Sequence, residues 1–166
     1  RQMMVLEGEV STVAALLDAA QTARASVPGA DVGVRHTAAA NARACARLLN
    51  NGDSVEAGWR FGILQTLDDY TSTLRRGGPG LAAGVFTDEP PHTGAVQIDA
   101  AFAALADYLA SRDGWTAPAW AQDTARRTTA WYPMVPEIFR GDAERESPDA
   151  FRERGIFITS RSLDRA

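Results

Sequence analysis

The chain has 166 residues, of which 45% are hydrophobic, and its 17 basic and 21 acidic residues give a formal net charge of −4. A chain of this length and composition can bury one substantial core, so we expect a single helical domain over residues 1–166. The acidic balance argues against general binding to DNA or RNA, whose phosphates call for an excess of positive charge. No lysine occurs in the sequence, which excludes lysine chemistry.

Three further features bear on the location and the extent of the protein. No apolar run reaches the ~20 residues that cross a bilayer, and no basic segment leads into a short apolar one, so we expect a cytoplasmic protein. The single Cys45 cannot form an internal disulfide, and its alanine-rich surroundings predict a buried thiol. Because the chain opens at Arg1-Gln2-Met3 without a convincing start, we expect it to begin inside a longer protein, and an N-terminal domain upstream of it stays an open alternative.

Residues 9–76 are predicted to form three helices. Apolar residues recur at helical spacing over 9–26, until Pro28 and Gly29 end the pattern. A second helix is expected over 34–49, where one narrow face carries small residues that permit close approach of another helix: Ala38, Ala42, Cys45 and Leu49. The same face could join two copies of the chain, so a homodimer stays an open alternative.

The third helix has the most regular pattern in the chain. Asp53 and Glu56 have the spacing of a capping box, with Asp in place of the usual Ser or Thr. A stripe of apolar side chains follows at helical spacing: Val55, Trp59, Ile63, Leu67, Tyr70 and Leu74. Residues 42–67 have the outline of a helix-turn-helix motif, but the second helix offers few groups that read bases. We therefore do not expect direct nucleic-acid binding by this chain.

Residues 77–97 interrupt the helical pattern with glycine and proline. The segment contains Gly77-Gly78-Pro79-Gly80 and Pro90-Pro91, and it predicts a connection that is longer than compact domains usually contain. We expect a hinge or a binding loop there. A fourth helix is predicted to begin with Asp99 as its cap and to end at Gly114.

The last fifty residues are rich in tryptophan and proline. Three of the four tryptophans fall between Trp115 and Trp131, and the prolines among them forbid one continuous helix. Short helices are predicted from Thr116 to Arg127 and after Ser147, followed by a strand-like segment over 155–158. The predicted fold is therefore all-α: a helical bundle whose residues 98–166 supply the fourth helix and a cap of short helices with at most one short strand.

Several motifs in residues 90–166 occur in the order seen in a known group of proteins. They are Pro90-Pro91-His92-Thr93-Gly94, Pro118-Ala119-Trp120, Trp131-Tyr132, Ser147-Pro148-Asp149-Ala150-Phe151-Arg152, Arg154-Gly155-Ile156-Phe157-Ile158 and Leu163-Asp164-Arg165-Ala166. In this half the chain resembles a group of small helical actinobacterial proteins described as helix-turn-helix regulators or antitoxin-like proteins. Some are encoded beside a nucleotidyltransferase-type toxin. The resemblance implies a cognate protein partner and no catalytic residue.

No arrangement of side chains in the sequence indicates a reaction centre. His36 and His92 lie far apart, without the Cys pair or the His spacing of a zinc site. No nucleophile elbow, Walker loop or dinucleotide-binding glycine motif occurs. We expect no catalytic residue, no metal and no cofactor, although an enzymatic role is not excluded.

Two hypotheses about function follow from these observations. The first is a non-enzymatic, antitoxin-like or regulatory module that binds and sequesters a partner protein through aromatic and arginine side chains: Trp120, Arg127, Trp131, Arg152 and Arg154. In the competing interpretation, these arginines pair with neighbouring acids of the same chain, and the tryptophans lie in the core.

The second hypothesis is a helical domain, binding or enzymatic, with a pocket between the third helix and the cap. There Trp59, Tyr70 and His92, with an arginine, would hold a small anionic ligand. A closed apolar pocket with one buried charge would favour this hypothesis, and a solid core would argue against it.

Overall fold

The computed structural model describes residues 33–164. The fold set out below is that of the unit Val34–Ala166, over its described residues. The helix predicted over residues 9–26 lies outside the described residues.

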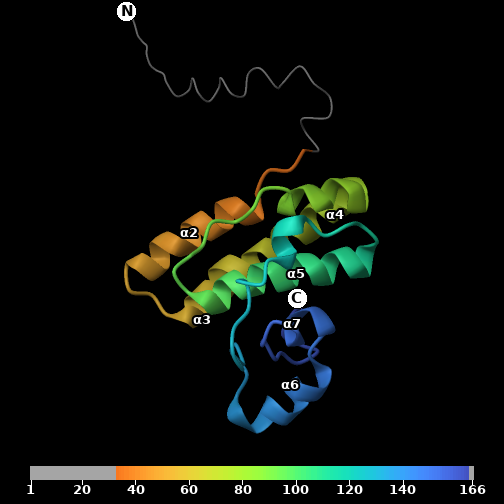
Figure 1. Ribbon diagram of the computed structural model, residues 1–166. Helices are drawn as coiled ribbons and strands as arrows, with labels where there is room; N and C mark the ends of the chain where they lie inside the picture. Colours follow the sequence, from red (N-terminus) through yellow and green to blue (C-terminus); the bar gives the residue numbers. More distant parts are fainter. Residues whose placement is uncertain (1–32, 165–166) are drawn as a thin grey trace, which may run out of the picture. The chain divides into compact units, whose positions relative to one another are not determined.

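The described part of the chain is all-α, as predicted (Figure 1). Its longer helices are α2 (Ala38–Asn50), α4 (Gln65–Ala82) and α5 (Val96–Asp113), and the short α3 (Val55–Gly58) runs into α4 through the π-helix η3 (Trp59–Leu64). No β-strand forms among residues 33–164. Helix α5 is the central element, because it packs against η3 and α3 as well as against the C-terminal segments.

Helix α2 shows why the chain places small residues on one face. Thr37 caps the helix, with its Oγ1 accepting a hydrogen bond from the Ala40 N–H at 3.1 Å. The buried face of α2 meets the glycines of α3 and η3, and a Cβ added to Gly62 would lie 3.3 Å from the Cys45 Sγ. The small-residue face is therefore used for close packing within one chain. This corrects the expectation that the face is available to a second copy.

The third predicted helix is observed, with a different cap and a π-helical turn. The cap is Ser54, whose Oγ accepts from the Ala57 N–H at 3.1 Å, and not the predicted Asp53. Within the turn, the Thr66 hydroxyl donates to the carbonyl of Gly62 at 2.7 Å. The predicted stripe does face the core, and its fully or nearly buried members are Trp59, Ile63, Leu67 and Tyr70.

The predicted long connection over residues 77–97 is largely helical. Helix α4 continues to Ala82 across a break at Gly78, whose φ of 81° falls in the region that favours glycine. The 3₁₀ turn η4 (Ala83–Phe86) follows, and its Phe86 is buried. Only residues 87–95 are non-helical. The prediction failed because burial of apolar side chains after Pro79 outweighs the local cost of the Gly-Pro-Gly sequence.

Helix α5 begins at Val96, ahead of its predicted cap. Ala95 is the capping residue, and Asp99 lies inside the first turn. Asp99 does not cap the helix, because its side chain reaches back to Thr93. The helix is buried on nearly every side, and it ends at Gly114, with a φ of 82°, as predicted.

The C-terminal segments form a cap of short elements, of which the first and the last pack against α5 (Figure 1). They are η5 (Ala119–Gln122), η6 (Glu137–Phe139), α6 (Arg140–Glu146) and α7 (Asp149–Arg152). The helix predicted from Thr116 to Arg127 is reduced to η5. The strand-like segment makes a single parallel bridge, Trp131 to Ile156, and does not extend into a strand within the described residues.

Candidate functional site

Two buried arginines attach the cap to the helical core. Arg154 is 5% exposed, and its guanidinium donates to Asp107 of α5 at 3.1 Å and to the carbonyls of Ala150 at 2.7 Å and Ala121 at 2.8 Å. These acceptors belong to the central helix, to α7 and to η5. A planar group with several fixed donors is suited to joining three segments in this way. Arg154 is therefore a structural residue, which corrects its assignment to a partner-binding surface.

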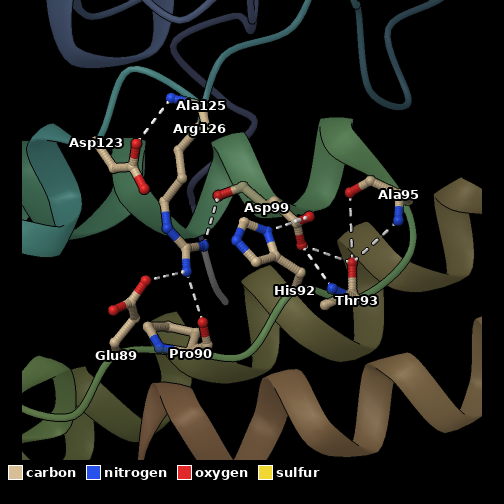
Figure 2. Close-up of polar contacts among 9 residues, drawn as sticks. All are labelled: Glu89, Pro90, His92, Thr93, Ala95, Asp99, Asp123, Ala125 and Arg126. Carbon is tan, nitrogen blue, oxygen red and sulfur yellow. Dashed lines mark hydrogen bonds and ion pairs between the residues drawn. The ribbon is translucent and has the colours of Figure 1, made fainter.

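Arg126 is the second buried arginine, and it was not among the predicted site residues. Its guanidinium donates to the carbonyl of Pro90 at 2.6 Å, to the carbonyl of Asp99 at 3.2 Å and to the Glu89 carboxylate at 3.2 Å (Figure 2). The Trp120 ring lies 5.1 Å from its guanidinium carbon. No sequence pattern distinguishes Arg126 from the exposed Arg127 beside it, because the difference depends on contacts with residues about thirty positions away.

The other predicted partner-binding residues have different environments. Trp120 is buried, and its Nε1–H donates to the carbonyl of Phe86 at 3.0 Å, so it belongs to the core. Trp131 is half-buried, with its ring edge against Trp59. Arg127 and Arg152 are exposed, although each donates to groups of the cap. The structure thus places Trp120 in the interior, and leaves a partner-binding role of Trp131, Arg127 and Arg152 as a prediction.

The three residues predicted to share a pocket are not brought together. Trp59 is 1% exposed and packs against Phe151, while Tyr70 is fully buried and donates its hydroxyl to Asp113 Oδ2 at 2.6 Å. Burial, reinforced by this hydrogen bond, raises the pKa of Tyr70 to about 12. His92 is exposed and lies in the 87–95 segment. A groove of about 310 Å³ does lie between α4 and the cap, with Leu67 and Ile158 among its lining residues, but none of the three predicted residues lines it, which corrects their assignment to a shared pocket.

An apolar surface is found on the cap instead. We define the cap face as Met134, Ile138 and Phe139, whose side chains are 51%, 83% and 49% exposed. A groove of about 280 Å³ borders it, and its lining is mixed: Met134, Val135, Pro136, Phe139, Asp142, Glu146, Thr159, Ser160, Arg161 and Ser162. Large apolar side chains exposed close together in one short segment of the chain are typical of binding surfaces.

The backbone around the cap face makes contacts through half-buried rings and exposed hydrogen-bonding groups. The Tyr132 ring stacks on Phe157 with centroids 5.2 Å apart, and its hydroxyl donates to Glu144 at 2.5 Å. The Ser160 N–H donates to Glu146 at 2.8 Å. Met134 has a φ of 55°, and it is the one non-glycine with positive φ among residues 33–164. Such a conformation persists only where the surroundings impose it, and it occurs often at functional sites.

A polar cluster joins the 87–95 segment to the start of α5 (Figure 2). Asp99 is 5% exposed, and one carboxylate oxygen accepts from the Thr93 N–H at 2.8 Å and from the Thr93 hydroxyl at 2.9 Å. The other oxygen lies 3.1 Å from the Nδ1 of His92. Together with Arg126, these contacts attach the non-helical segment to the start of α5.

Three further observations limit the chemistry of residues 33–164. No group of three or more His, Cys, Asp or Glu side chains there could hold a metal ion. The Cys45 thiol is buried, and burial raises its pKa to about 11, which leaves it unreactive near neutral pH. No helix in this part of the chain is long and apolar enough to cross a membrane.

Comparison with known proteins identifies no relative. No family model matches the sequence, and neither a curated protein nor a solved structure matches the chain. The resemblance of residues 90–166 to antitoxin-like proteins therefore depends on the motifs alone, and function has to be argued from the surfaces of the molecule.

Proposed function

We propose that this chain is a non-enzymatic protein-binding module that sequesters a cognate partner, and that the cap face is its contact surface. The observation that carries the proposal is the exposure of Met134, Ile138 and Phe139 beside a groove, on a cap that is otherwise tightly bonded to the core. The role as an antitoxin-like or regulatory protein comes from the motifs of residues 90–166. A cytoplasmic location belongs to the same proposal.

The energetic argument starts from Ile138. Fully burying a side chain of this size contributes roughly 1.5–3 kcal/mol, and Ile138 is 83% exposed in the free chain, so nearly all of that free energy is available on binding. Met134 and Phe139 are half-exposed and add smaller contributions. Interfaces commonly depend on a few such central side chains.

The rigidity of the cap supports the same conclusion. Ordering a flexible segment on binding costs free energy, and this cost offsets part of what the interface contributes to affinity. Tyr132, Glu144 and Glu146 already hold the backbone on both sides of the cap face through the hydrogen bonds described above. The apolar side chains are therefore presented on a backbone that needs little reorganisation.

Charged groups at the edge of the cap face suit a polar rim. Asp142 pairs with Arg145, and the Arg140 guanidinium lies 4.8 Å from the Tyr132 ring centroid. Arg161 lines the groove. An apolar centre with mixed charges around it is the usual composition of a protein interface. We propose a partner that offers an apolar pocket for Ile138 and polar groups around it, in keeping with a toxin encoded nearby.

The test is native mass spectrometry of the tagged protein purified from its own cells with the neighbouring genes intact. We expect a mass increment equal to one adjacent gene product. The Ile138→Glu variant should lose this increment, because a carboxylate would have to be buried in the partner. The matched control is Val96→Glu, since Val96 is 47% exposed at the start of α5, where an acid is tolerated.

Two results would count against the proposal. A bare chain in every preparation would remove the case for a sequestered partner. A complex that survives Ile138→Glu as well as Val96→Glu would show that the contact surface lies elsewhere.

A further inference from the structure

A second hollow lies away from the cap, between the C-terminal end of α2 and the turn at residues 92–94. It is an open groove of about 580 Å³, lined by Ala46, Arg47, Leu49, Asn50, His92, Thr93 and Gly94. Residues more than forty positions apart in the sequence thus form its two walls. We call it the α2 groove. The proposed partner contact does not involve any of its residues.

His92 enters this groove in a fixed orientation. Its Nδ1 lies 3.1 Å from Asp99 Oδ2, and Asp99 is itself held by Thr93 and nearly buried. The tautomer of His92 that suits this contact is the one that donates from Nδ1, because an ionised carboxylate only accepts hydrogen bonds. The side chain of His92 is 59% exposed, so its other nitrogen, Nε2, is the one left for a ligand. A histidine whose ring is oriented by a carboxylate is a common arrangement in binding and catalytic sites.

The other polar groups of the groove are mostly hydrogen-bond donors. Arg47 is exposed on α2 and brings a guanidinium, and Asn50 at the end of the same helix brings an amide. Gly94 has a φ of 97°, and no atom lies within 4 Å of the position where a Cβ would be, so the backbone there is open to a ligand. Asp99 is the acid in contact with His92, and its oxygens already accept from Thr93 and His92.

We propose that the α2 groove binds a small oxyanion ligand, a phosphomonoester or a carboxylate, between Arg47 and the imidazolium form of His92. Arg47 supplies paired donors that suit the oxygens of either group, and the His92 Nε2–H supplies a third. Asn50 adds a neutral donor. The competing interpretation is that His92 only covers the Asp99 carboxylate, in which case the groove binds nothing.

The charge on His92 makes the proposed binding depend on pH. Two charged groups bear on the ring: Asp99 from α5 contacts it, and Arg47 from α2 lines the same groove. Arg126, which forms an ion pair with Glu89, belongs to the same polar cluster and contacts Asp99 through its backbone carbonyl. When His92 is neutral its Nε2 accepts hydrogen bonds and does not donate them, so the affinity for an oxyanion falls as the pH rises.

The test is an NMR titration of the isotope-labelled chain at constant ionic strength. The probes are inorganic phosphate, methyl phosphate and acetate, and the signals are the Gly94 amide, the Arg47 side chain and the ring nitrogens of His92. We expect saturable shifts at these three residues. Methyl phosphate binding more tightly than acetate assigns a phosphomonoester, and the reverse order assigns a carboxylate. The ring nitrogen shifts also show directly whether Nδ1 carries the proton.

Three variants separate specific binding from general attraction of anions. Arg47→Ala and His92→Ala should each weaken binding by about tenfold, because each removes a charge-assisted hydrogen bond. Arg43→Ala is the matched control, since Arg43 is exposed on the same helix one turn earlier and does not line the groove. All three changes are at exposed positions, so the fold should survive them.

The affinity for sulfate, whose charge is constant near neutral pH, should fall as pH rises in the native chain but not in His92→Ala. Shifts that do not saturate would overturn the proposal, as would equal losses in Arg43→Ala and Arg47→Ala or a pH profile unchanged by removal of His92. Loss of oxyanion binding in Arg47→Ala with retention of the protein partner would show that the two surfaces are independent.

Discussion

Replacement of Arg154 by alanine tests how much this buried side chain contributes to holding the cap on the core. The substitution removes three hydrogen bonds, to Asp107 and to the carbonyls of Ala150 and Ala121, at a side chain that is 5% exposed. Breaking a buried ion pair costs about 3–5 kcal/mol. Asp107 is 29% exposed and regains water after the change, so we take the lower end of that range, about 3 kcal/mol.

The assay is urea unfolding followed by circular dichroism and by tryptophan fluorescence. A loss of about 3 kcal/mol is a large fraction of the roughly 5–15 kcal/mol that holds an ordinary domain together. The matched control is Arg152→Ala two residues earlier, whose exposed ion pair with Asp149 is worth at most about 1 kcal/mol. Arg154→Lys should recover little, because one ammonium cannot reach three separated acceptors. Equal stabilities of the Arg154→Ala and Arg152→Ala variants would refute the reasoning.

Three other predictions concern the described residues. Gly155→Ala should lower the free energy of unfolding in urea by at least about 2 kcal/mol, because the φ of Gly155 is 82° and a Cβ there would lie 1.9 Å from the Thr128 oxygen. The control Gly52→Ala, at a φ of 96° with open space around it, should cost about 1 kcal/mol. Similar losses in the two variants would contradict this prediction. Folding raises the pKa of Tyr70 from 10.0 to about 12, so the contribution of the protonated Tyr70 to stability should be intact below pH 10 and lost as the pH rises towards 12. Between these two pH values the free energy of unfolding should therefore fall less for Tyr70→Phe than for the native chain. Cys45 should resist a thiol reagent at neutral pH in the native protein and react after unfolding, and rapid reaction of the folded chain would show that the α2 packing opens readily.

The predictable part of the fold was the part with strong periodicity. The stripe through Trp59, Ile63 and Leu67 identified a long helix and its buried face, and Gly114 marked where α5 ends. These features depend on residues three and four positions apart, or on one residue with special backbone freedom. They can therefore be recognised within a short window of sequence.

The errors occurred where distant contacts decide local structure. Gly78 and Pro79 suggested a loop, yet the segment after them is helical because Phe86 is buried in the core. Asp99 was predicted to cap its own helix, and it holds Thr93 instead. Local propensity was outweighed by tertiary packing in both cases.

The candidate sites were harder to predict than the helices. The sequence indicated a cap rich in aromatic and arginine side chains, but Trp120 and Arg154 proved to be interior, and the exposed apolar residues are the less conspicuous Met134 and Ile138. Aromatic and arginine side chains are used both in cores and at interfaces. Composition alone does not distinguish the two uses.

The sequence by itself determined that the described part of the chain is helical, where its most regular helix runs, and that the sequence contains no recognised catalytic or phosphate-binding motif. These properties follow from periodicity, charge and the spacing of particular residue types. Only the tertiary structure decided which of two adjacent arginines, Arg126 or Arg127, is buried, and that His92 and Arg47 line the same groove. The physical reason is that burial and orientation depend on groups brought together from distant parts of the chain, which no local pattern records.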